Sequence, residues 1–386
     1  TVEIDGVKHA LRSLPSGIYN PNVTNVIANG VVMNPFALLD ELDENINSGL
    51  KTYNLKISNR CHLIMPYHID LDGAYEEALG DNKIGTTKRG IGPCYADKAK
   101  RIGIRAGDLL DKEYLHKRLE AALAVDNKEL VAFGKKPYEI EPLYEKLLAA
   151  TERLRPFITD TSIFLNDMID AGKRVVFEGA QGSLLDLDHG TYPFVTSSSP
   201  TSISIPLNAG IAPQKINKVL AIMKAYMTRV GGGPMPTEQN NDWGNAIREK
   251  GHEYGVVTHR PRRVGYLDLV LLGYTMRISG VTDIACMLFD VLMDVKDLKV
   301  CVAYKLDGKE IHYVPASEPE YARCIPVYKD FKTIPTFDTK KIKTLDDLPI
   351  EAKEYLGFIS DYLKAPISIL SLGPDRTETV NLKKLY

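Results

Sequence analysis

A glycine-rich segment with hydroxyls and cations is the first part of the chain that could bind a ligand. It runs Gly85-Thr86-Thr87-Lys88-Arg89-Gly90-Ile91-Gly92-Pro93. Glycines let the backbone approach a ligand closely, hydroxyl and amide groups bind phosphate oxygens, and the two cations supply charge. A solvated loop before a charged helix explains the same residues equally well. The sequence has no GxxxxGK[ST] match, so the pattern alone does not indicate a phosphate loop.

Three arginines around one proline form a second candidate site, Val256-Val257-Thr258-His259-Arg260-Pro261-Arg262-Arg263. Guanidinium groups bind carboxylates and phosphates bidentately, so the cluster favours an anionic substrate. A basic surface rim paired with nearby acidic side chains is the alternative. We expect His259 to be an exposed loop residue that takes no part in the chemistry.

Polar side chains also follow an apolar run at 174–178. Gln181, in Glu178-Gly179-Ala180-Gln181-Gly182, could present an acceptor and donors to the edge of a base. A hydroxyl-rich run follows at 195–202, and such runs suit phosphate contacts and exposed loops equally well. Both stretches are therefore candidates that need the rest of the fold to place them.

Acidic residues offer two further interpretations. Asp186 and Asp188 could bind a metal ion, but two carboxylates two residues apart are a weak signal. For His189 we expect packing or a local hydrogen bond. Asp290 follows a predicted strand, where its carboxylate could accept hydrogen bonds from the ring N–H and the exocyclic amine of guanine, a donor pair that adenine lacks. A helix N-cap is the plain alternative for Asp290.

Composition limits the class of protein. The chain has 386 residues, of which 44% are hydrophobic, with 48 Lys and Arg against 50 Asp and Glu. This balance is typical of a soluble globular protein and argues against a nucleic-acid binder. No apolar run reaches the roughly 18 residues of a membrane span. The five cysteines form no CxxC pair, so we expect reduced thiols in a cytoplasmic protein.

Periodicity predicts the elements that must position these residues. Residues 35–48 should form a helix with proline in its first turn. Leucines four residues apart, at 115, 119 and 123 and at 143 and 147, predict a mainly helical stretch over 106–171. Short apolar runs predict buried strands at 174–178, 219–223, 282–289 and 367–372.

Near-continuous apolar strands suit a sheet covered on both faces, and such sheets bind ligands beyond the carboxyl ends of their strands. We therefore predict an α/β fold with a large central, mostly parallel sheet flanked by helices and carrying helical insertions. We interpret residues 1–386 as a single domain of this kind.

Taken together, long ordered strings of the chain resemble adenylosuccinate synthetase, and the match extends over nearly the whole sequence. Such strings are far more specific than a lone glycine-rich loop. They are residues 84–87, 92–93, 177–182, 188–198, 224–226, 228–231, 236–238, 260–263 and 373–376.

The resemblance implies a P-loop-NTPase-like fold, with a helical insertion at about 106–171 and a C-terminal nucleotide-base-binding part at about 281–386. It implies a GTP-dependent ligase that joins IMP and L-aspartate, with Mg²⁺ as cofactor, in a cytoplasmic homodimer. The 6-oxygen of IMP attacks the γ-phosphate, and the aspartate amine then displaces phosphate from the 6-phosphoryl-IMP intermediate.

The resemblance also assigns residues to each substrate. Those implied to contact IMP are Thr87, Arg101, Gln181, Thr196 and Arg260. Those implied to contact aspartate are Val256, Val257, Thr258, His259, Arg260, Pro261 and Arg262. Those implied to contact GTP are Arg262, Leu288, Phe289, Asp290, Ser371, Leu372 and Gly373. Gln181 would also support catalysis, and Arg101 would reach the IMP phosphate of the partner subunit.

The family's opening segment has no counterpart before Thr1. That segment contains a strand, Gly-Asp-Glu-Gly-Lys-Gly-Lys and Gly-His-Asn-Ala-Gly-His-Thr, and it carries the catalytic Asp and His, the phosphate loop and the metal ligand. Thr1 aligns with the last Thr. We expect the natural chain to carry the segment, because losing a central strand would leave a buried sheet edge unpaired. No metal ligand is therefore assigned within residues 1–386.

Three departures bear on specificity. The family's Lys-x-Asp guanine motif is Leu288-Phe289-Asp290 here, which removes the lysine stem that covers the base. His259 stands where the family has Gly, and residues 199–206 replace a small, glycine-rich continuation. A related ligase that uses ATP and dGMP, as in phage relatives, and a non-catalytic nucleotide-binding paralogue are the alternatives.

Overall fold

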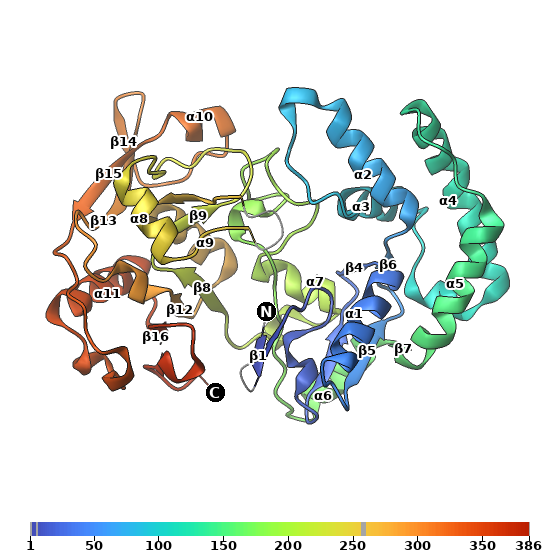
Figure 1. Ribbon diagram of the computed structural model, residues 1–386, viewed down its shortest axis with the longest axis horizontal. Helices are drawn as coiled ribbons and strands as arrows, with labels where there is room; N and C mark the ends of the chain where they lie inside the picture. The colour runs from blue at the N-terminus through green and yellow to red at the C-terminus, as the bar shows by residue number, and fades with distance from the viewer. Residues whose placement is uncertain (1, 5–6, 256–259, 386) are drawn as a thin grey trace. The chain divides into compact units, whose positions relative to one another are not determined.

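The computed structural model describes residues 2–4, 7–255 and 260–385. They fall into two compact units, drawn in Figure 1. The first unit consists of residues 1–180, 196–200 and 204–215, and the second of residues 181–195, 201–203 and 216–386. Each unit has its own sheets and its own hydrophobic core.

The first unit contains a small, wholly parallel sheet. Its strands are β3 (Thr24–Ile27), β5 (Asn54–Ser58) and β7 (Ile158–Thr159), with β5 in the middle. Ile27 and Ile57 are buried, whereas the strand residues next to them are partly exposed or polar. Two short pairs accompany this sheet: β1 (Val2–Ile4) with β2 (Val7–His9), and β4 (Val32–Met33) with β6 (His62–Leu63).

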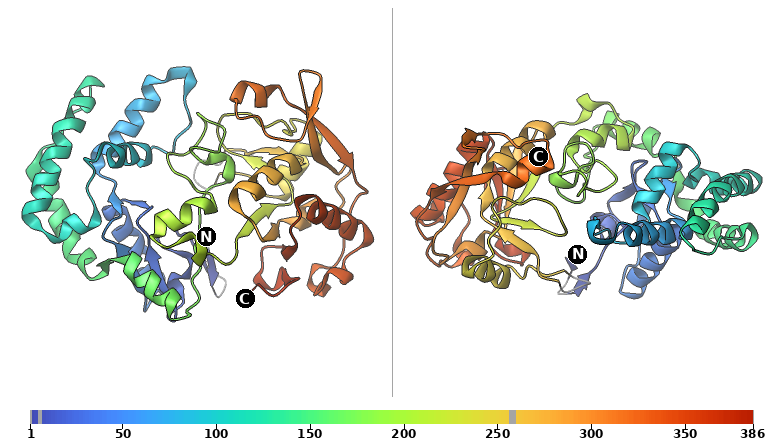
Figure 2. Two further views of the ribbon diagram at one scale, coloured as in Figure 1. Left: turned by 180° about the vertical axis from the view of Figure 1, so that it is seen from behind. Right: turned by 90° about the horizontal axis from the view of Figure 1, so that it is seen from above.

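Helices make up most of the rest of the first unit. The predicted helix over 35–48 is confirmed as α1 (Pro35–Asn47), and the Asn34 side chain caps its first turn. The leucines that predicted helices beyond residue 106 are buried side chains of α4 (Lys112–Ala132) and α5 (Ile140–Leu154), which lie side by side in Figures 1 and 2. The other helices described in this unit are α2 (Pro66–Ala78), α3 (Ile91–Lys100), α6 (Thr161–Asp170) and α7 (Ile205–Ala209).

The second unit is built on a four-stranded sheet in the order β17–β16–β12–β8. Three of its strands are parallel and match predicted runs: β8 (Leu220–Lys224), β12 (Asp283–Met287) and β16 (Ile367–Ser371). The fourth, β17 (Thr379–Asn381), is antiparallel to β16. Because Met287 lies opposite Lys224 and Cys286 opposite Leu370, the three parallel strands end at one edge.

A second sheet and four helices complete this unit. Its strands are β11 (Leu267–Asp268), β13 (Lys299–Leu306), β14 (Lys309–Ile311) and β15 (Ile325–Asp330), and a separate pair joins β9 (Met227–Arg229) to β10 (Arg263–Gly265). The helices are α8 (Asp242–Lys250), α9 (Leu269–Ser279), α10 (Glu318–Arg323) and α11 (Ile350–Leu363). Side chains of α9 and α11 share one buried core with β12 and β16.

The α/β class is confirmed, but the predicted strand at 174–178 is wrong. Those residues have no strand assignment, and the Val176 side chain is 87% exposed. A strand needs a neighbour for its backbone hydrogen bonds, and none of the described strands pairs with this run. The described strands also lie in several small sheets, where the sequence suggested one large sheet.

All five cysteines are free, as predicted, and all five are also buried. Within the described ranges, no helix combines the length and apolar character that crossing a bilayer requires.

Candidate functional site

Asp290 lies just beyond the carboxyl end of β12. It belongs to a 3-10 turn, Phe289–Leu292, whose N-cap is Leu288 with φ 58°, so Asp290 is not the cap. Oδ1 of Asp290 is buried and has no hydrogen-bond partner among the described residues. Burial and the Glu378 carboxylate raise the pKa of Asp290. An unpaired buried carboxylate oxygen is unfavourable, so this atom is suited to accept a hydrogen bond from a ligand.

The residues after β16 lie at the same edge of the sheet, because β12 and β16 are parallel neighbours. Ser371 and Leu372 are buried, and the Ser371 hydroxyl donates to the Gly373 carbonyl at 3.1 Å. A Cβ atom on Gly373 would lie 2.3 Å from Oε2 of Glu378, so a side chain there would have to displace the Glu378 carboxylate. The structure thus brings together the predicted GTP residues Leu288, Phe289, Asp290, Ser371, Leu372 and Gly373.

The arginine segment also belongs to the second unit, where it forms part of a hairpin. Its two sides, 253–255 and 260–262, are joined by hydrogen bonds from Gly255 N to Arg260 O at 2.9 Å and from Arg262 N to Glu253 O at 2.8 Å. The predicted aspartate-binding residues Val256, Val257, Thr258 and His259 lie outside the described residues.

The three arginines of this segment have different surroundings. Arg263 forms a bidentate ion pair with Glu238, at 2.8 and 2.5 Å. For Arg263, the alternative of a basic residue paired with a nearby acidic side chain is therefore confirmed. Arg262 donates through Nη1 to Glu253 at 2.7 Å. Arg260 is exposed, next to Pro261, and its side chain makes no hydrogen bond recorded among the described residues. Two guanidinium groups therefore remain suited to bind an anion.

Gln181 begins the second unit with an unusual backbone. Its φ is 55°, in the left-handed region that side chains rarely adopt, and the residue is exposed. Downstream, both Asp186 oxygens are occupied by protein donors: Oδ1 by the N–H groups of Asp188 and His189, and Oδ2 by the Thr201 hydroxyl at 2.8 Å. Asp186 therefore shapes the turn and offers no oxygen that a metal ion could take without breaking it.

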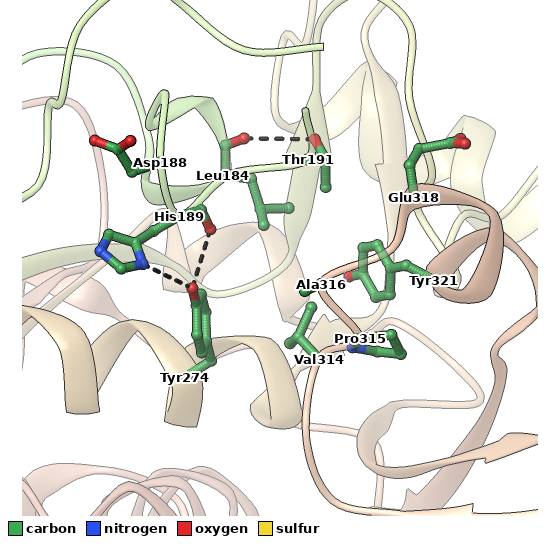
Figure 3. Close-up of a pocket in the computed structure, with 11 residues that line it drawn as sticks. Leu184, Asp188, His189, Thr191, Tyr274, Val314, Pro315, Ala316, Glu318 and Tyr321 are labelled. Carbon is green, nitrogen blue, oxygen red and sulfur yellow. Dashed lines mark hydrogen bonds between the residues drawn. The ribbon is translucent and has the colours of Figure 1, made fainter. Parts of the chain in front are cut away.

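A small cavity beside His189 is a separate feature of the second unit (Figure 3). The Tyr274 hydroxyl lies 3.3 Å from Nδ1 of His189 and donates to its carbonyl oxygen at 3.2 Å, which confirms a local role for this histidine. The cavity measures about 110 Å³, far below the roughly 300 Å³ at which ligand pockets begin. None of its lining residues is a predicted substrate contact.

In the first unit, two buried carboxylates of α2 hold the glycine-rich loop. Asp72 accepts hydrogen bonds from the Thr86 hydroxyl and from Gly90 N, both at 2.9 Å. Glu76 accepts from the backbone N–H groups at 84 and 85, at 3.2 and 3.0 Å. These bonds fix the backbone on both sides of Thr87, whose side chain is exposed.

Of the other two predicted IMP residues of this unit, Arg101 lies at the C-terminal end of α3, and Thr196 lies in a loop that passes near the beginning of that helix. Arg101 terminates the helix with φ 67°, and its exposed guanidinium makes no hydrogen bond recorded among the described residues. A Cβ atom on Gly92 would lie 3.1 Å from the Ser197 hydroxyl, so the loop containing Thr196 runs close to the first turn of α3. Thr87, Thr196 and the beginning of α3 are thereby placed in one region.

Residues 1–380 match the family model described as adenylosuccinate synthetase. The chain belongs to the adenylosuccinate synthetase family. The adenylosuccinate synthetase of Listeria innocua is 47% identical over 387 residues, which cover 100% of this chain and 90% of that protein. That of Ligilactobacillus salivarius is also 47% identical, over 389 residues and the same shares of each chain.

Solved structures agree with this assignment. The fully ligated adenylosuccinate synthetase from Plasmodium falciparum has a TM-score of 0.91 at 35% identity and covers 99% of this chain and 90% of that one. The succinoaminodeoxyadenylate synthetase of cyanophage S-2L, bound to dGMP and dATP, has a TM-score of 0.59 at 19% identity, over 99% of this chain and 83% of that one. The second likeness shows a shared fold alone.

A GTP-dependent ligase family generally implies a divalent metal ion. Within the described residues, one buried group could hold one: His68, Asp97 and Asp126, whose ligand atoms lie within 4.8 Å of one another. The Met65 N–H donates to Nδ1 of His68 at 2.9 Å, so a neutral His68 ring carries its proton on Nε2, 3.0 Å from Oδ2 of Asp97. A protonated Nε2 cannot bind a cation. This group is therefore a hydrogen-bond network and does not fit the metal ion of a nucleotide.

Sequence reasoning missed three carboxylates that bond to residues of the predicted segments. Glu253 pairs with Arg262, Glu238 pairs with Arg263, and Asp72 holds the loop around Thr87. In the sequence, the only sign of these three carboxylates was that an acidic residue lies near each arginine or glycine cluster. Their partners lie 9 to 25 residues away, so spacing could not identify the pairs.

Proposed function

We propose that this chain catalyses the ligation of IMP and L-aspartate to adenylosuccinate, with cleavage of GTP to GDP and phosphate. Membership of the adenylosuccinate synthetase family over residues 1–380 carries the proposal. The reaction belongs to purine nucleotide synthesis in the cytoplasm. Asp290 supports guanine as the base of the donor, because its buried, unpaired Oδ1 can accept from the donor pair that guanine has and adenine lacks.

The reaction proceeds in two displacements. The 6-oxygen of IMP attacks the γ-phosphorus of GTP, GDP leaves, and 6-phosphoryl-IMP forms. The amine of aspartate then attacks C6, and phosphate leaves with the oxygen. Thr87, Thr196 and Gln181 bind IMP in this scheme, and Gln181 also supports catalysis. Arg260 and Arg262 neutralise the aspartate carboxylates and the charge on the transferred phosphate.

The active form is a homodimer in this proposal. Arg101 reaches the IMP phosphate of the partner subunit, and its guanidinium, which is exposed and has no partner recorded among the described residues, supports that role. Mg²⁺ accompanies GTP and would help to neutralise its phosphates. Because the described residues supply no fitting ligand set, no step is assigned to the ion.

One observation favours a second candidate, a related ligase that uses ATP, dGMP or both. Leu288 replaces the lysine of the family's guanine motif, so the lysine stem that would cover the base is missing. A non-catalytic nucleotide-binding paralogue is the third candidate.

The test is an assay of the native full-length protein with each donor and acceptor in turn. GTP or ATP is combined with IMP or dGMP and L-aspartate, with Mg²⁺ present, and the product is identified by mass spectrometry. We expect adenylosuccinate from GTP and IMP. Higher turnover with ATP or dGMP would establish the second candidate. Nucleotide binding without product in any combination would leave the paralogue.

A further inference from the structure

The Glu253 carboxylate is buried beneath the arginine hairpin and accepts hydrogen bonds from three side chains. Lys224 Nζ donates to Oε1 at 2.6 Å, the Tyr226 hydroxyl donates to the same oxygen at 2.7 Å, and Arg262 Nη1 donates to Oε2 at 2.7 Å. Glu253 itself is 1% exposed. Buried carboxylates of this kind persist only where cations and donors compensate for the lost water.

Two cations meet at this single carboxylate. Burial acts to raise the pKa of Glu253, but the hydrogen bonds from Lys224, Tyr226 and Arg262 outweigh it and hold the pKa below its ordinary value. Burial lowers the pKa of Lys224, and the positive charge of Arg262 adds to that effect. Without the Glu253 charge, the two cations would repel each other at close range.

The backbone gives Glu253 a second hold on the same loop. Its carbonyl accepts from Arg262 N at 2.8 Å, and its N–H donates to the Arg248 carbonyl at 2.9 Å. Lys224 is the last residue of β8, where the parallel strands of the second unit end. Glu253 therefore connects the base of the hairpin to the strand edge at which ligands of such sheets bind.

We propose that Glu253 is a positioning residue that holds the Arg262 guanidinium at the end of β8 and thereby sets the affinity for aspartate. Glu253 occupies only Nη1 of Arg262. No hydrogen bond to Nη2 or Nε is recorded among the described residues, so these donors can face a ligand carboxylate or phosphate. This inference rests on the proposed role of Arg262 in binding aspartate and GTP.

The first experiment is steady-state kinetics of Glu253→Gln in the full-length protein. Glutamine keeps the shape of the side chain but leaves both cations without a counter-charge. We expect KM for aspartate to rise about tenfold to a hundredfold, with KM for IMP changed less than about threefold. The matched control is Glu238→Gln, which removes the neighbouring ion pair to Arg263 and should change KM for aspartate by less than about threefold.

A double-mutant cycle separates positioning from a merely structural role. If Glu253 acts through Arg262, adding Glu253→Gln to the Arg262→Ala variant should have no further effect on KM for aspartate. An equal rise in both backgrounds would overturn the proposal. A parallel loss of affinity for all three substrates, together with a lower melting temperature, would also overturn it.

A labelling measurement keeps the inference independent of turnover. Phenylglyoxal modifies accessible arginines, and peptide mass spectrometry reads the rate at Arg262. We expect Arg262 to react at least about fivefold faster in Glu253→Gln than in the unmodified protein or in Glu238→Gln. If the protein makes no adenylosuccinate, the proposed function fails, and the labelling result still stands. Equal labelling rates at Arg262 in Glu253→Gln and in the unmodified protein would show that Glu253 does not hold Arg262.

Discussion

The carboxyl groups of Asp97 and Asp126 approach within 4.8 Å in a buried space where α3 and α4 meet α2. Neither oxygen of Asp126 has a hydrogen-bond partner among the described residues. Two ionised carboxylates would repel each other there, while His68 already donates to Asp97. Burial is the main cause that raises the pKa of Asp126 to about 8, and the negative charge of Asp97 is the second. Asp126 therefore holds a proton at neutral pH.

This proton makes stability depend on pH in a direction opposite to that of an ordinary carboxylate. An unfolded aspartate loses its proton near pH 3.9, so between about pH 4 and pH 8 the folded chain binds one proton more than the unfolded chain. Stability contributed by this site should therefore fall as pH rises through that window. Asp126→Asn should be more stable than the unmodified protein at about pH 9, by about 1–3 kcal/mol, and nearly equal at about pH 4.

Urea unfolding of both proteins at several pH values measures this difference. Asp43→Asn is the control, because Asp43 is half-exposed, and its hydrogen bond to Arg153 lowers its pKa. That surface pair should contribute less than about 1 kcal/mol, and its contribution should be lost toward acid rather than alkaline pH. An Asp126→Asn protein that is less stable than the unmodified one at pH 9 would contradict the interpretation that Asp126 is protonated in the folded chain.

The unpaired oxygen of Asp290 predicts a selective loss of guanine-nucleotide binding. Asp290→Asn replaces the carboxylate proposed to accept hydrogen bonds from guanine with a neutral amide. The affinity for GTP should therefore fall by about tenfold to a hundredfold. Binding of IMP should stay within about threefold. Titration calorimetry with each nucleotide alone measures both constants.

Asp294→Asn is the matched control for Asp290, since Asp294 is exposed and its oxygens already accept from Thr336. It should leave the affinity for GTP unchanged within about threefold. Equal affinities for GTP in the Asp290→Asn and unmodified proteins would show that this oxygen does not contact the base.

Two glycines of the second unit predict opposite effects of the same substitution. A Cβ atom on Gly373 would collide with Glu378, which itself accepts from the Thr339 hydroxyl at 3.0 Å. Gly373→Ala should therefore displace Glu378 and weaken GTP binding by at least about tenfold. Gly357 lies in α11, and a Cβ atom there meets nothing within 4 Å. Gly357→Ala should stabilise the protein by about 0.5–1 kcal/mol with GTP binding unchanged. Thermal unfolding and nucleotide titration of both variants decide this pair.

The sequence predicted elements whose signals are local. Proline in the first turn predicted α1, and leucines at helical spacing predicted α4 and α5. Apolar runs predicted β8, β12 and β16, which need no knowledge of their neighbours. The run at 174–178 has the same composition, yet it forms no strand, because strand formation depends on a neighbouring strand that composition does not reveal.

The candidate site divides in the same way. The segments around Thr87, Arg260 and Asp290 could be recognised from residue types and from ordered family motifs. The pairings could not, because Glu253 could have bonded to any of several cations close to it in the sequence. Only the fold shows that it takes Lys224 and Arg262 and leaves Arg260 unpaired among the described residues.

Arg101 allows a direct test of the proposed shared site. Arg101→Leu and Gln181→Ala should each lower activity by about tenfold or more, because both residues are proposed to bind IMP. When the two variants are mixed and allowed to exchange subunits, about half of the dimers carry one of each. If Arg101 acts in the partner subunit's site, one of the two sites in each such dimer is intact, so activity should recover to about a quarter of the unmodified value. If Arg101 acts in its own subunit's site, every site keeps one defect, and mixing should restore nothing.

Size-exclusion chromatography before and after mixing checks that dimers form. Mass spectrometry of the native complexes measures the mixed fraction against which the recovery is judged.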